Sequence, residues 1–420
     1  MIIAEAPASP GQRILWLMNH YNAGNGRLNY PLLLRLRGPL DTGQLQHAID
    51  TVIRRHESLR TTFGRSRGLL TQFIHEPRSQ AITVKQCGPP SVPEPSEVVQ
   101  AEVRSPIDPR SAPLRVTLWA LAPDEHILCI NAHHLVTDAW SCRVVLEELL
   151  QLLSRHPDLP RPGWQYRHFV QWQRRRATME RQKADREYWN RQLAGTRAPG
   201  LAYRAGQPPA AGAPCAETIQ LDLGSEDWGR IRKTARAEQT TPFTVMLSIY
   251  YLLLHRESGD TDLAVSSPFA NRVRPEVMRT VGFFANMLVL RTRLRNGSTF
   301  AHLIRNTSST VNAALAHQAF AHFLPSAGPR EDAGRRVENI VFQMLPELPP
   351  PARVGDLELS ILPPGIDSRF DLEFSALPHH GGLRVLIQCS PSLPGGVGQR
   401  LAAGLGSVIG KLAAGPGFPV

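Results

Sequence analysis

The chain has 420 residues, of which 42% are hydrophobic and 20% charged, and this composition is ordinary for a globular protein with room for two domains. A net charge of +11 favours acidic partners, either a protein or nucleic acid, but the basic residues are spread along the chain without a nucleic-acid-binding motif. The five cysteines are widely spaced and form no Cys-x-x-Cys pair, which argues against a disulfide framework or a zinc site. The sequence has no signal-peptide pattern and no apolar segment long enough to span a membrane. These features predict a cytoplasmic protein.

Helical and strand patterns alternate along the chain, so the expected fold class is α/β or α+β. The first half contains an amphipathic helix at residues 41–56, with its apolar positions on one face. A mostly apolar segment at 127–133 predicts a buried strand, and 144–153 predicts a helix soon after it. Residues 165–193 form a long, basic helical stretch.

Three segments without a periodic pattern are predicted to be loops: residues 88–96, 198–216 and 325–335. The middle segment is rich in proline, glycine and alanine. We therefore expect a domain boundary just before it or within it.

Two helix starts are predicted in the second half. Ser225 is expected to cap one helix, because two acidic residues follow it in the first turn. Thr241 and Pro242 predict another start, because threonine caps well and proline fits the first helical position. Residues 243–255 are apolar on all sides, so this second helix should be buried.

The most distinctive local feature is the pair His133 and His134, which ends the strand predicted at 127–133 and precedes a short turn, Asp138 and a helix. Adjacent strand residues point to opposite faces, so one imidazole should face a cleft and the other should pack inside. Asp138 could hold the turn through an arginine or through backbone N–H groups. A histidine can take a proton from a nucleophile and pass it to a leaving group, which suits acyl transfer.

Taken alone, a pair of histidines is more often structural than catalytic. Metal binding is disfavoured because no cysteine or histidine ligands lie nearby at suitable spacing. A serine-nucleophile hydrolase is disfavoured because the Gly-x-Ser-x-Gly pattern is missing from the sequence.

Residues 132–141 resemble the His-His-x-x-x-Asp-Gly motif of condensation domains from nonribosomal peptide synthetases and their relatives in the chloramphenicol-acetyltransferase-like superfamily. Further segments resemble motifs of this family in the same order along nearly the whole chain. They are residues 9–16, 55–63, 166–173, 188–195, 267–276, 281–286, 317–318 and 368–372.

The resemblance implies two acetyltransferase-like subdomains, residues 1–175 and 176–420, which form a V around a central tunnel. In this family a carrier protein brings the acyl donor on its phosphopantetheine arm, and an amine acceptor enters from the other side as a small molecule or on a second carrier. The domain itself binds no cofactor. The chain is thus expected to be a monomeric, amide-forming acyltransferase of antibiotic and other secondary metabolism. Its partners would be acidic carriers, and neither nucleic acid nor membrane.

The same resemblance implies roles for individual residues. His134 is expected where the two arms meet, either as a general base or to position the amine and stabilise the tetrahedral intermediate. His133 would orient the loop. Asp138 is expected to be structural and to pair with Arg272 of the second half.

Ser141 and Asn286 are weaker candidates for lining the tunnel, with packing or capping as the alternative for each. Ala139 replaces the glycine of the family motif, and the loop would be strained if this position needed a positive φ. Residues 319–320 and 330–336 also depart from the family pattern, which concerns the acceptor side more than the basic chemistry.

Several other functions are compatible with the sequence. An alcohol acceptor would make the product an ester, an epimerase would need no second substrate, and an inert condensation-like module would only recruit another protein. A nucleic-acid-binding role is supported by charge alone. The family pattern extends to the end of the chain, so we expect either a free-standing enzyme or a domain excised from a synthetase. It would bind acidic carriers through its basic surface, in a manner weakened by salt.

Overall fold

The computed structural model describes residues 1–21, 26–86, 97–154, 159–176, 179–201, 215, 217–295, 297–318, 337–347, 349–363, 368–379 and 381–420. The chain forms two compact units. Unit 1 comprises Met1–Ala177, Ala270–Ala285 and Pro349–Ile366, and unit 2 comprises Thr178–Phe269, Asn286–Leu348 and Asp367–Val420. The first unit therefore includes two segments from the second half of the sequence. The expected division at residue 175, the V shape and the tunnel stay predictions.

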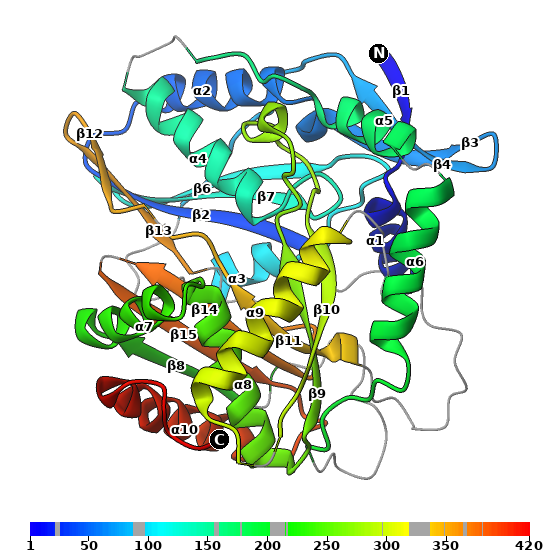
Figure 1. Ribbon diagram of the computed structural model, residues 1–420. Coiled ribbons are helices and arrows are strands. Elements are labelled where there is room, and N and C mark those ends of the chain that lie inside the picture. Colours follow the sequence, from blue (N-terminus) through cyan, green and yellow to red (C-terminus); the bar gives the residue numbers. More distant parts are fainter. Residues whose placement is uncertain are drawn as a thin grey trace. The chain divides into compact units, whose positions relative to one another are not determined.

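Unit 1 contains a six-stranded sheet, a three-stranded sheet and five α-helices within its described residues (Figure 1). The six-stranded sheet has the order β12-β13-β2-β7-β6-β5, and the small sheet has the order β1-β4-β3. The strands are β1 Ile2–Pro7, β2 Asn29–Arg37, β3 Thr61–Ser66, β4 Leu69–His75, β5 Thr83–Gln86, β6 Leu114–Ala122, β7 Glu125–His133, β12 Ala352–Val354 and β13 Leu357–Leu362. The helices are α1 Pro10–Tyr21, α2 Thr42–Arg55, α3 Glu97–Arg104, α4 Ala139–Leu153 and α5 Tyr166–Arg176.

The central strand β7 is buried on both faces, which explains its continuous apolar run. Leu128 and Ile130 belong to the hydrophobic cluster shared with α2 and α4. Ile127 and Cys129 belong to a second cluster, which includes residues of α3. The strand predicted at 127–133 is confirmed, with two further residues at its start.

The helices predicted in this half are present. Asp41 caps α2 by accepting hydrogen bonds from two backbone N–H groups, and the apolar face of α2 is buried as expected. Helix α4 begins at Ala139, five residues before the predicted start. The predicted stretch 165–193 contains two helices, α5 and α6, on either side of residues 177–178, which lie outside the described residues.

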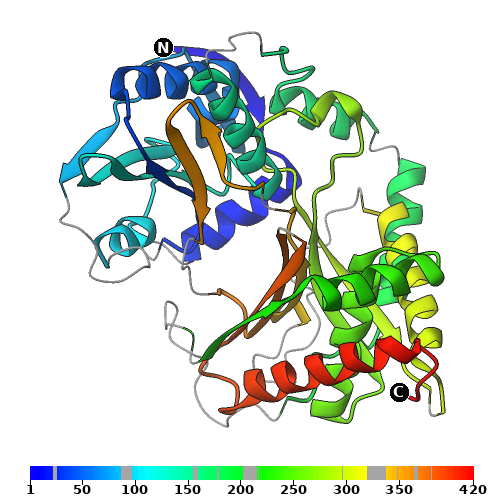
Figure 2. The ribbon, with the colours of Figure 1, turned by 90° about the vertical axis from the view of Figure 1, so that its left-hand side faces the viewer.

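Unit 2 has a six-stranded sheet with the order β10-β9-β11-β14-β15-β8. Its strands are β8 Glu217–Leu223, β9 Asp262–Phe269, β10 Asn286–Arg293, β11 Ile340–Met344, β14 Leu372–His379 and β15 Gly382–Cys389. Its helices are α6 Met179–Leu193, α7 Ser225–Ala237, α8 Pro242–Ser258, α9 Phe300–Ala316 and α10 Val397–Lys411. Figure 2, in which α10 is red, shows this helix lying along the sheet, where it contacts β8 and β15.

Helix α8 is the core of unit 2. Every side chain from Thr244 to Leu254 is buried, as the all-round apolar pattern predicts. Thr241 caps this helix by accepting a hydrogen bond from the backbone N–H of Thr244, so the predicted start is confirmed. The cap predicted at Ser225 is wrong by one residue, since Gly224 is the cap of α7 and makes no side-chain cap bond.

Two of the predicted loops, 88–96 and 325–335, lie outside the described residues, as does most of 198–216. Across the part of the chain that the structure describes, no helix combines the length and the apolar character needed to cross a bilayer.

Candidate active site

Strand β7 ends at the histidine pair, and backbone hydrogen bonds fix the chain on both sides of it. The backbone N–H of His133 donates to the carbonyl of Pro113 at 2.8 Å. The backbone N–H of His134 donates to the carbonyl of Leu28 at 2.7 Å. The turn then closes with a bond of 2.9 Å from the N–H of Val136 to the carbonyl of His133. The backbone that carries both imidazoles is therefore held in place.

The ring of His134 has a defined tautomer. Its Nδ1 lies 2.7 Å from the carbonyl oxygen of Thr137, which can only accept, so Nδ1 carries a proton and the neutral ring has its lone pair on Nε2. The ring contacts the aromatic rings of Tyr30 and Phe283, with centroid distances of 4.8 and 5.0 Å. His134 is 8% exposed. An imidazole held in this way can act as a base through Nε2.

His133 has a different environment. It is 1% exposed, and its Nδ1 accepts a hydrogen bond of 3.1 Å from the backbone N–H of Leu135. Its Nε2 therefore carries the proton and lies 3.3 Å from Oδ1 of Asn19. Burial, together with the nearby His134, lowers the pKa of His133 to about 3. This imidazole stays neutral near pH 7 and supports the loop from inside.

Asp138 is fully engaged in structural contacts. Its Oδ1 accepts from the backbone N–H of Ser141 at 2.8 Å, which caps α4, and lies 3.3 Å from Nη2 of Arg272. Its Oδ2 accepts from the backbone N–H of Phe284 at 3.0 Å. The carboxylate thus uses both partners considered from the sequence, an arginine and backbone N–H groups. It ties the histidine turn to residues 270–285.

Arg272 is almost completely buried, and its guanidinium holds the same loop. Nη1 donates to the carbonyls of Val277 and Thr280 at 2.5 and 2.7 Å, and Nη2 donates to Oγ of Ser141 at 2.9 Å. Burial lowers the pKa of Arg272, and the charge of Asp138 opposes this effect. The sequence prediction that these two residues pair agrees with their contact.

Ser141 and Gly282 join α4 to the same loop. The Ser141 hydroxyl donates to the carbonyl of Gly282 at 2.8 Å and accepts from its N–H at 3.0 Å. A side chain at Gly282 would lie 2.3 Å from the ring of Tyr166, so only glycine fits there. Ser141 is fully buried. Its contacts are those of a packing residue, and its place beside a tunnel stays a prediction.

Ala139 is the first residue of α4. The described non-glycine residues with positive φ are Arg67, Gln239 and Asn271, so the alanine that replaces the motif glycine needs no left-handed conformation. The strain considered from the sequence does not occur. Asn286 begins β10 in unit 2, where its Nδ2 donates to the carbonyl of Gln318 at 2.6 Å. Its role in a tunnel stays a prediction.

The opening motif supplies residues that sequence reasoning left without a role. Ser9 and Gln12 form a reciprocal cap at the start of α1, with bonds of 2.9 and 3.0 Å. The side-chain amide of Gln12 also donates to the carbonyl of Leu135 at 3.0 Å, next to His134. The Ser-x-x-Gln spacing was the available signal for the cap, but its contact with the histidine turn depends on the fold.

The motif at residues 55–63 is also structural. His56 and Glu148 are fully buried and lie 3.0 Å apart, and Arg55 donates two hydrogen bonds to the same carboxylate. Burial alone would raise the pKa of Glu148, but the bonds from His56 and Arg55 outweigh it and lower the pKa to about 2. This network joins α2 to α4, the helix that follows the histidine turn.

Among the described residues, no group of three or more His, Cys, Asp or Glu side chains is placed to hold a metal ion.

The family model of the Condensation domain matches residues 2–391. The chain belongs to this family. Over 326 residues, or 75% of its length, this condensation domain is 33% identical to a linear gramicidin synthase chain of Brevibacillus parabrevis. The match covers 6% of that synthase chain, and other curated relatives are covered over 2–12% of their length.

Solved structures are also similar to this condensation domain. The SgcC5 protein from Streptomyces globisporus is 26% identical with a TM-score of 0.77, and the match covers 99% of this chain and 100% of that one. The first condensation domain of the calcium-dependent antibiotic synthetase, solved with a substrate analogue, has a TM-score of 0.82 at 21% identity over 100% of this chain and 98% of that one. These likenesses confirm the expected acetyltransferase-like α/β fold.

Proposed function

We propose that this condensation domain transfers an acyl or aminoacyl group from a carrier-bound thioester to an amine, and so forms an amide. The observation that carries the proposal is the hydrogen bond from Nδ1 of His134 to the carbonyl of Thr137, which leaves Nε2 as the basic nitrogen. The donor would arrive on the phosphopantetheine arm of an acidic carrier protein, in accord with the net charge of +11. The domain itself would need no cofactor.

In the proposed reaction the amine nitrogen attacks the thioester carbonyl carbon and forms the C–N bond. Nε2 of His134 accepts a proton from this nitrogen, either during the attack or from the tetrahedral intermediate. The intermediate collapses, the C–S bond breaks, and the thiolate leaves with a proton from the imidazolium. Asp138 takes no direct part, because Ser141, Phe284 and Arg272 occupy its carboxylate.

The direct test incubates the protein with acyl-loaded carriers and candidate amines, and follows the released product by mass spectrometry. The His134→Ala variant should react about 10²–10⁴ times more slowly, which is the usual contribution of a general base. His47→Ala changes an exposed histidine of α2 and should leave the rate unchanged. Equal rates for wild type and His134→Ala would contradict the proposed role of this imidazole.

An ester product is the second candidate. The SgcC5 structure contains (R)-(-)-1-(2-naphthyl)-1,2-ethanediol, a molecule with two hydroxyl groups. An alcohol acceptor follows the same proton path, because Nε2 would take the hydroxyl proton. Parallel reactions with matched amine and alcohol acceptors separate the two products by mass. If neither product forms with any loaded carrier, an inert recruitment module becomes the better description.

The remaining features of the proposal concern the setting of the protein. We propose a monomer that acts in the cytoplasm in the biosynthesis of a peptide natural product, without nucleic acid or membrane as a partner. Carrier binding should weaken as salt rises, because an acidic carrier would meet a basic surface. Light scattering and carrier binding at two salt concentrations test the monomer and the charge dependence separately.

A further inference from the structure

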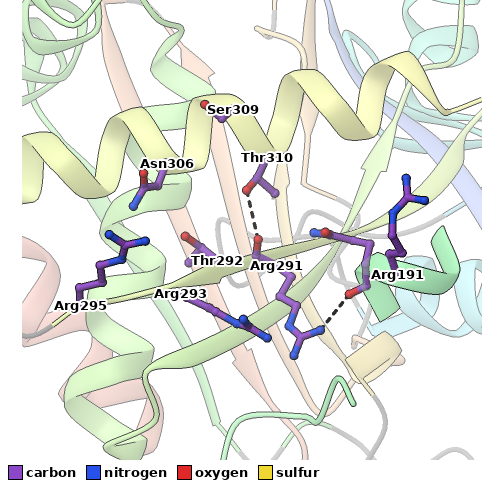
Figure 3. A pocket seen from close by; sticks show the side chains of 9 residues that line it. Arg191, Arg291, Thr292, Arg293, Arg295, Asn306, Ser309 and Thr310 are labelled. Carbon is purple, nitrogen blue, oxygen red and sulfur yellow. Dashed lines mark hydrogen bonds between the residues drawn. The ribbon is translucent and has the colours of Figure 1, made fainter. Parts of the chain in front are cut away.

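Unit 2 contains a polar cavity of about 470 Å³ that has no part in the proposed reaction (Figure 3). It lies beside β10, which is an edge strand of the sheet, and it is also lined by residues from α9 and from the end of α6. All of the lining residues belong to unit 2. The cavity is therefore defined by this unit alone.

The lining is cationic and carries no large apolar side chain. Arginine occurs four times, and the other lining residues are neutral and polar. Pockets for acyl or aromatic ligands are lined mainly by apolar and aromatic groups, so this cavity is poorly suited to them. The nine residues are Arg191, Gln192, Arg291, Thr292, Arg293, Arg295, Asn306, Ser309 and Thr310.

One of the four guanidinium groups is rigidly fixed. Arg291 makes two hydrogen bonds of 2.7 Å to Asp262, and its Nη1 donates to the carbonyls of Gln192 and Ala194 at 3.0 and 2.8 Å. Arg293 approaches the same carboxylate at 3.1 Å. Two arginines thus share a single negative charge, so this side of the cavity keeps a net positive charge.

The other two arginines add to this charge. Arg191 and Arg295 are exposed, and none of the carboxylates that the structure describes lies within 4.0 Å of their side-chain nitrogens. Figure 3 shows Arg295 on the side of the cavity that faces Asn306 of α9. Four arginines therefore line the cavity while two of them share the one carboxylate of Asp262, so an anion bound there would offset the remaining positive charge.

The wall of the cavity also contains a buried hydroxyl. Thr292 is 4% exposed and lines the cavity, and its Oγ1 is buried without a hydrogen-bond partner among the described residues. Because this oxygen has almost no accessible surface, a ligand in the cavity would not contact it, and the arginines alone carry the site.

We propose that this cavity binds a phosphate-bearing small molecule. Arginine forms bidentate hydrogen bonds with phosphate oxygens, and a doubly charged group matches the excess positive charge better than a single carboxylate does. The volume exceeds that of one phosphate, so the ligand is either a phosphoester with an organic body or a diphosphate. This site goes beyond the proposed acyl transfer and does not depend on it.

Isothermal titration calorimetry at constant ionic strength tests the site with three compounds: sodium pyrophosphate, 4′-phosphopantetheine and pantetheine. At least one of the two phosphate compounds should bind, and pantetheine should not. Binding of pyrophosphate alone assigns a diphosphate, and binding of phosphopantetheine assigns a phosphoester. Arg191→Gln combined with Arg295→Gln should weaken binding about tenfold or more, because two charged donors are lost.

The matched control is Lys233→Gln combined with Arg236→Gln, which removes the same charge from exposed positions on α7. Circular dichroism checks that both double variants are folded. The proposal is overturned if neither phosphate compound binds, if pantetheine binds as tightly as 4′-phosphopantetheine, or if the control variant weakens binding equally. Tighter binding of an oligoglutamate peptide than of pyrophosphate would also overturn it, in favour of an acidic protein partner.

Discussion

The Asp138→Asn substitution tests whether this motif carboxylate is structural or chemical. In the folded protein both carboxylate oxygens accept hydrogen bonds, from Ser141 and Arg272 on one side and from Phe284 on the other. An asparagine of the same shape keeps one acceptor and replaces the other with an NH₂ group. At least one buried N–H donor therefore faces another donor, and the buried guanidinium loses its balancing charge.

The expected loss of stability follows from these contacts. Removing one partner of a buried ion pair costs about 3–5 kcal/mol. Arg272 keeps its bonds to Val277, Thr280 and Ser141, so the lower end of that range, about 3 kcal/mol, applies to Asp138→Asn. Urea unfolding followed by circular dichroism measures this change. Glu147→Gln is the matched control, because this partly exposed residue pairs with Arg143 at the surface of α4 and should contribute less than about 1 kcal/mol.

A double variant sharpens the test. Removing both buried charges with Asp138→Asn and Arg272→Met should destabilise unit 1 less than the sum of the two single changes, by about 1–3 kcal/mol. An Asp138→Asn protein with the wild-type urea midpoint and strongly reduced turnover would refute the structural assignment. The carboxylate would then have to act on the substrate or on its proton.

Two further predictions concern the packing around the site. The pKa of Glu148 is about 2 in the folded protein against an ordinary value of 4.5, because the bonds from His56 and Arg55 outweigh burial. The lowered pKa corresponds to about 3 kcal/mol of folding free energy, which should be present above about pH 4.5 and be lost as the pH falls toward 2. In urea titrations at several pH values, Glu148→Gln should not show this loss of stability between about pH 4.5 and 2. Gly282→Ala should destabilise the protein by about 1–3 kcal/mol, because the added methyl group would overlap Tyr166. Gly406→Ala on the open face of α10 is the control and should be neutral or stabilising. Similar melting temperatures for the two variants would contradict this packing.

Local patterns were sufficient to predict many of the elements. The cap at Thr241, the buried helix after it and the strand before the histidines each depend on residues close in sequence, and each is present. The error at Ser225 is also local, because a serine followed by acidic residues is equally typical of the cap and of the first turn. The histidine pair could be singled out from sequence because it follows an apolar strand, but its catalytic role was expected only through the family resemblance.

Long-range contacts could not be read from these patterns. The bond from Gln12 to the carbonyl of Leu135 spans 123 positions, and the bond from Ser141 to Gly282 spans 141. No periodicity connects such residues. The pairing of Asp138 with Arg272 was anticipated only through the family resemblance. The inclusion of residues 270–285 and 349–366 in unit 1 was not anticipated from the pattern at all.

These contacts divide the residues of the motif by role. His134 has the geometry of a base, and the other residues hold it in position. His133 is neutral and buried, Asp138 has both oxygens occupied, and Ser141 is bonded to the opposite loop. Each of them holds the turn between β7 and α4 in one conformation. That turn includes the Thr137 carbonyl, which sets the tautomer of His134. The supporting residues therefore affect the reaction by keeping the proton of His134 on Nδ1. A substitution that moves the Thr137 carbonyl away from Nδ1 should reduce turnover even if His134 itself is retained.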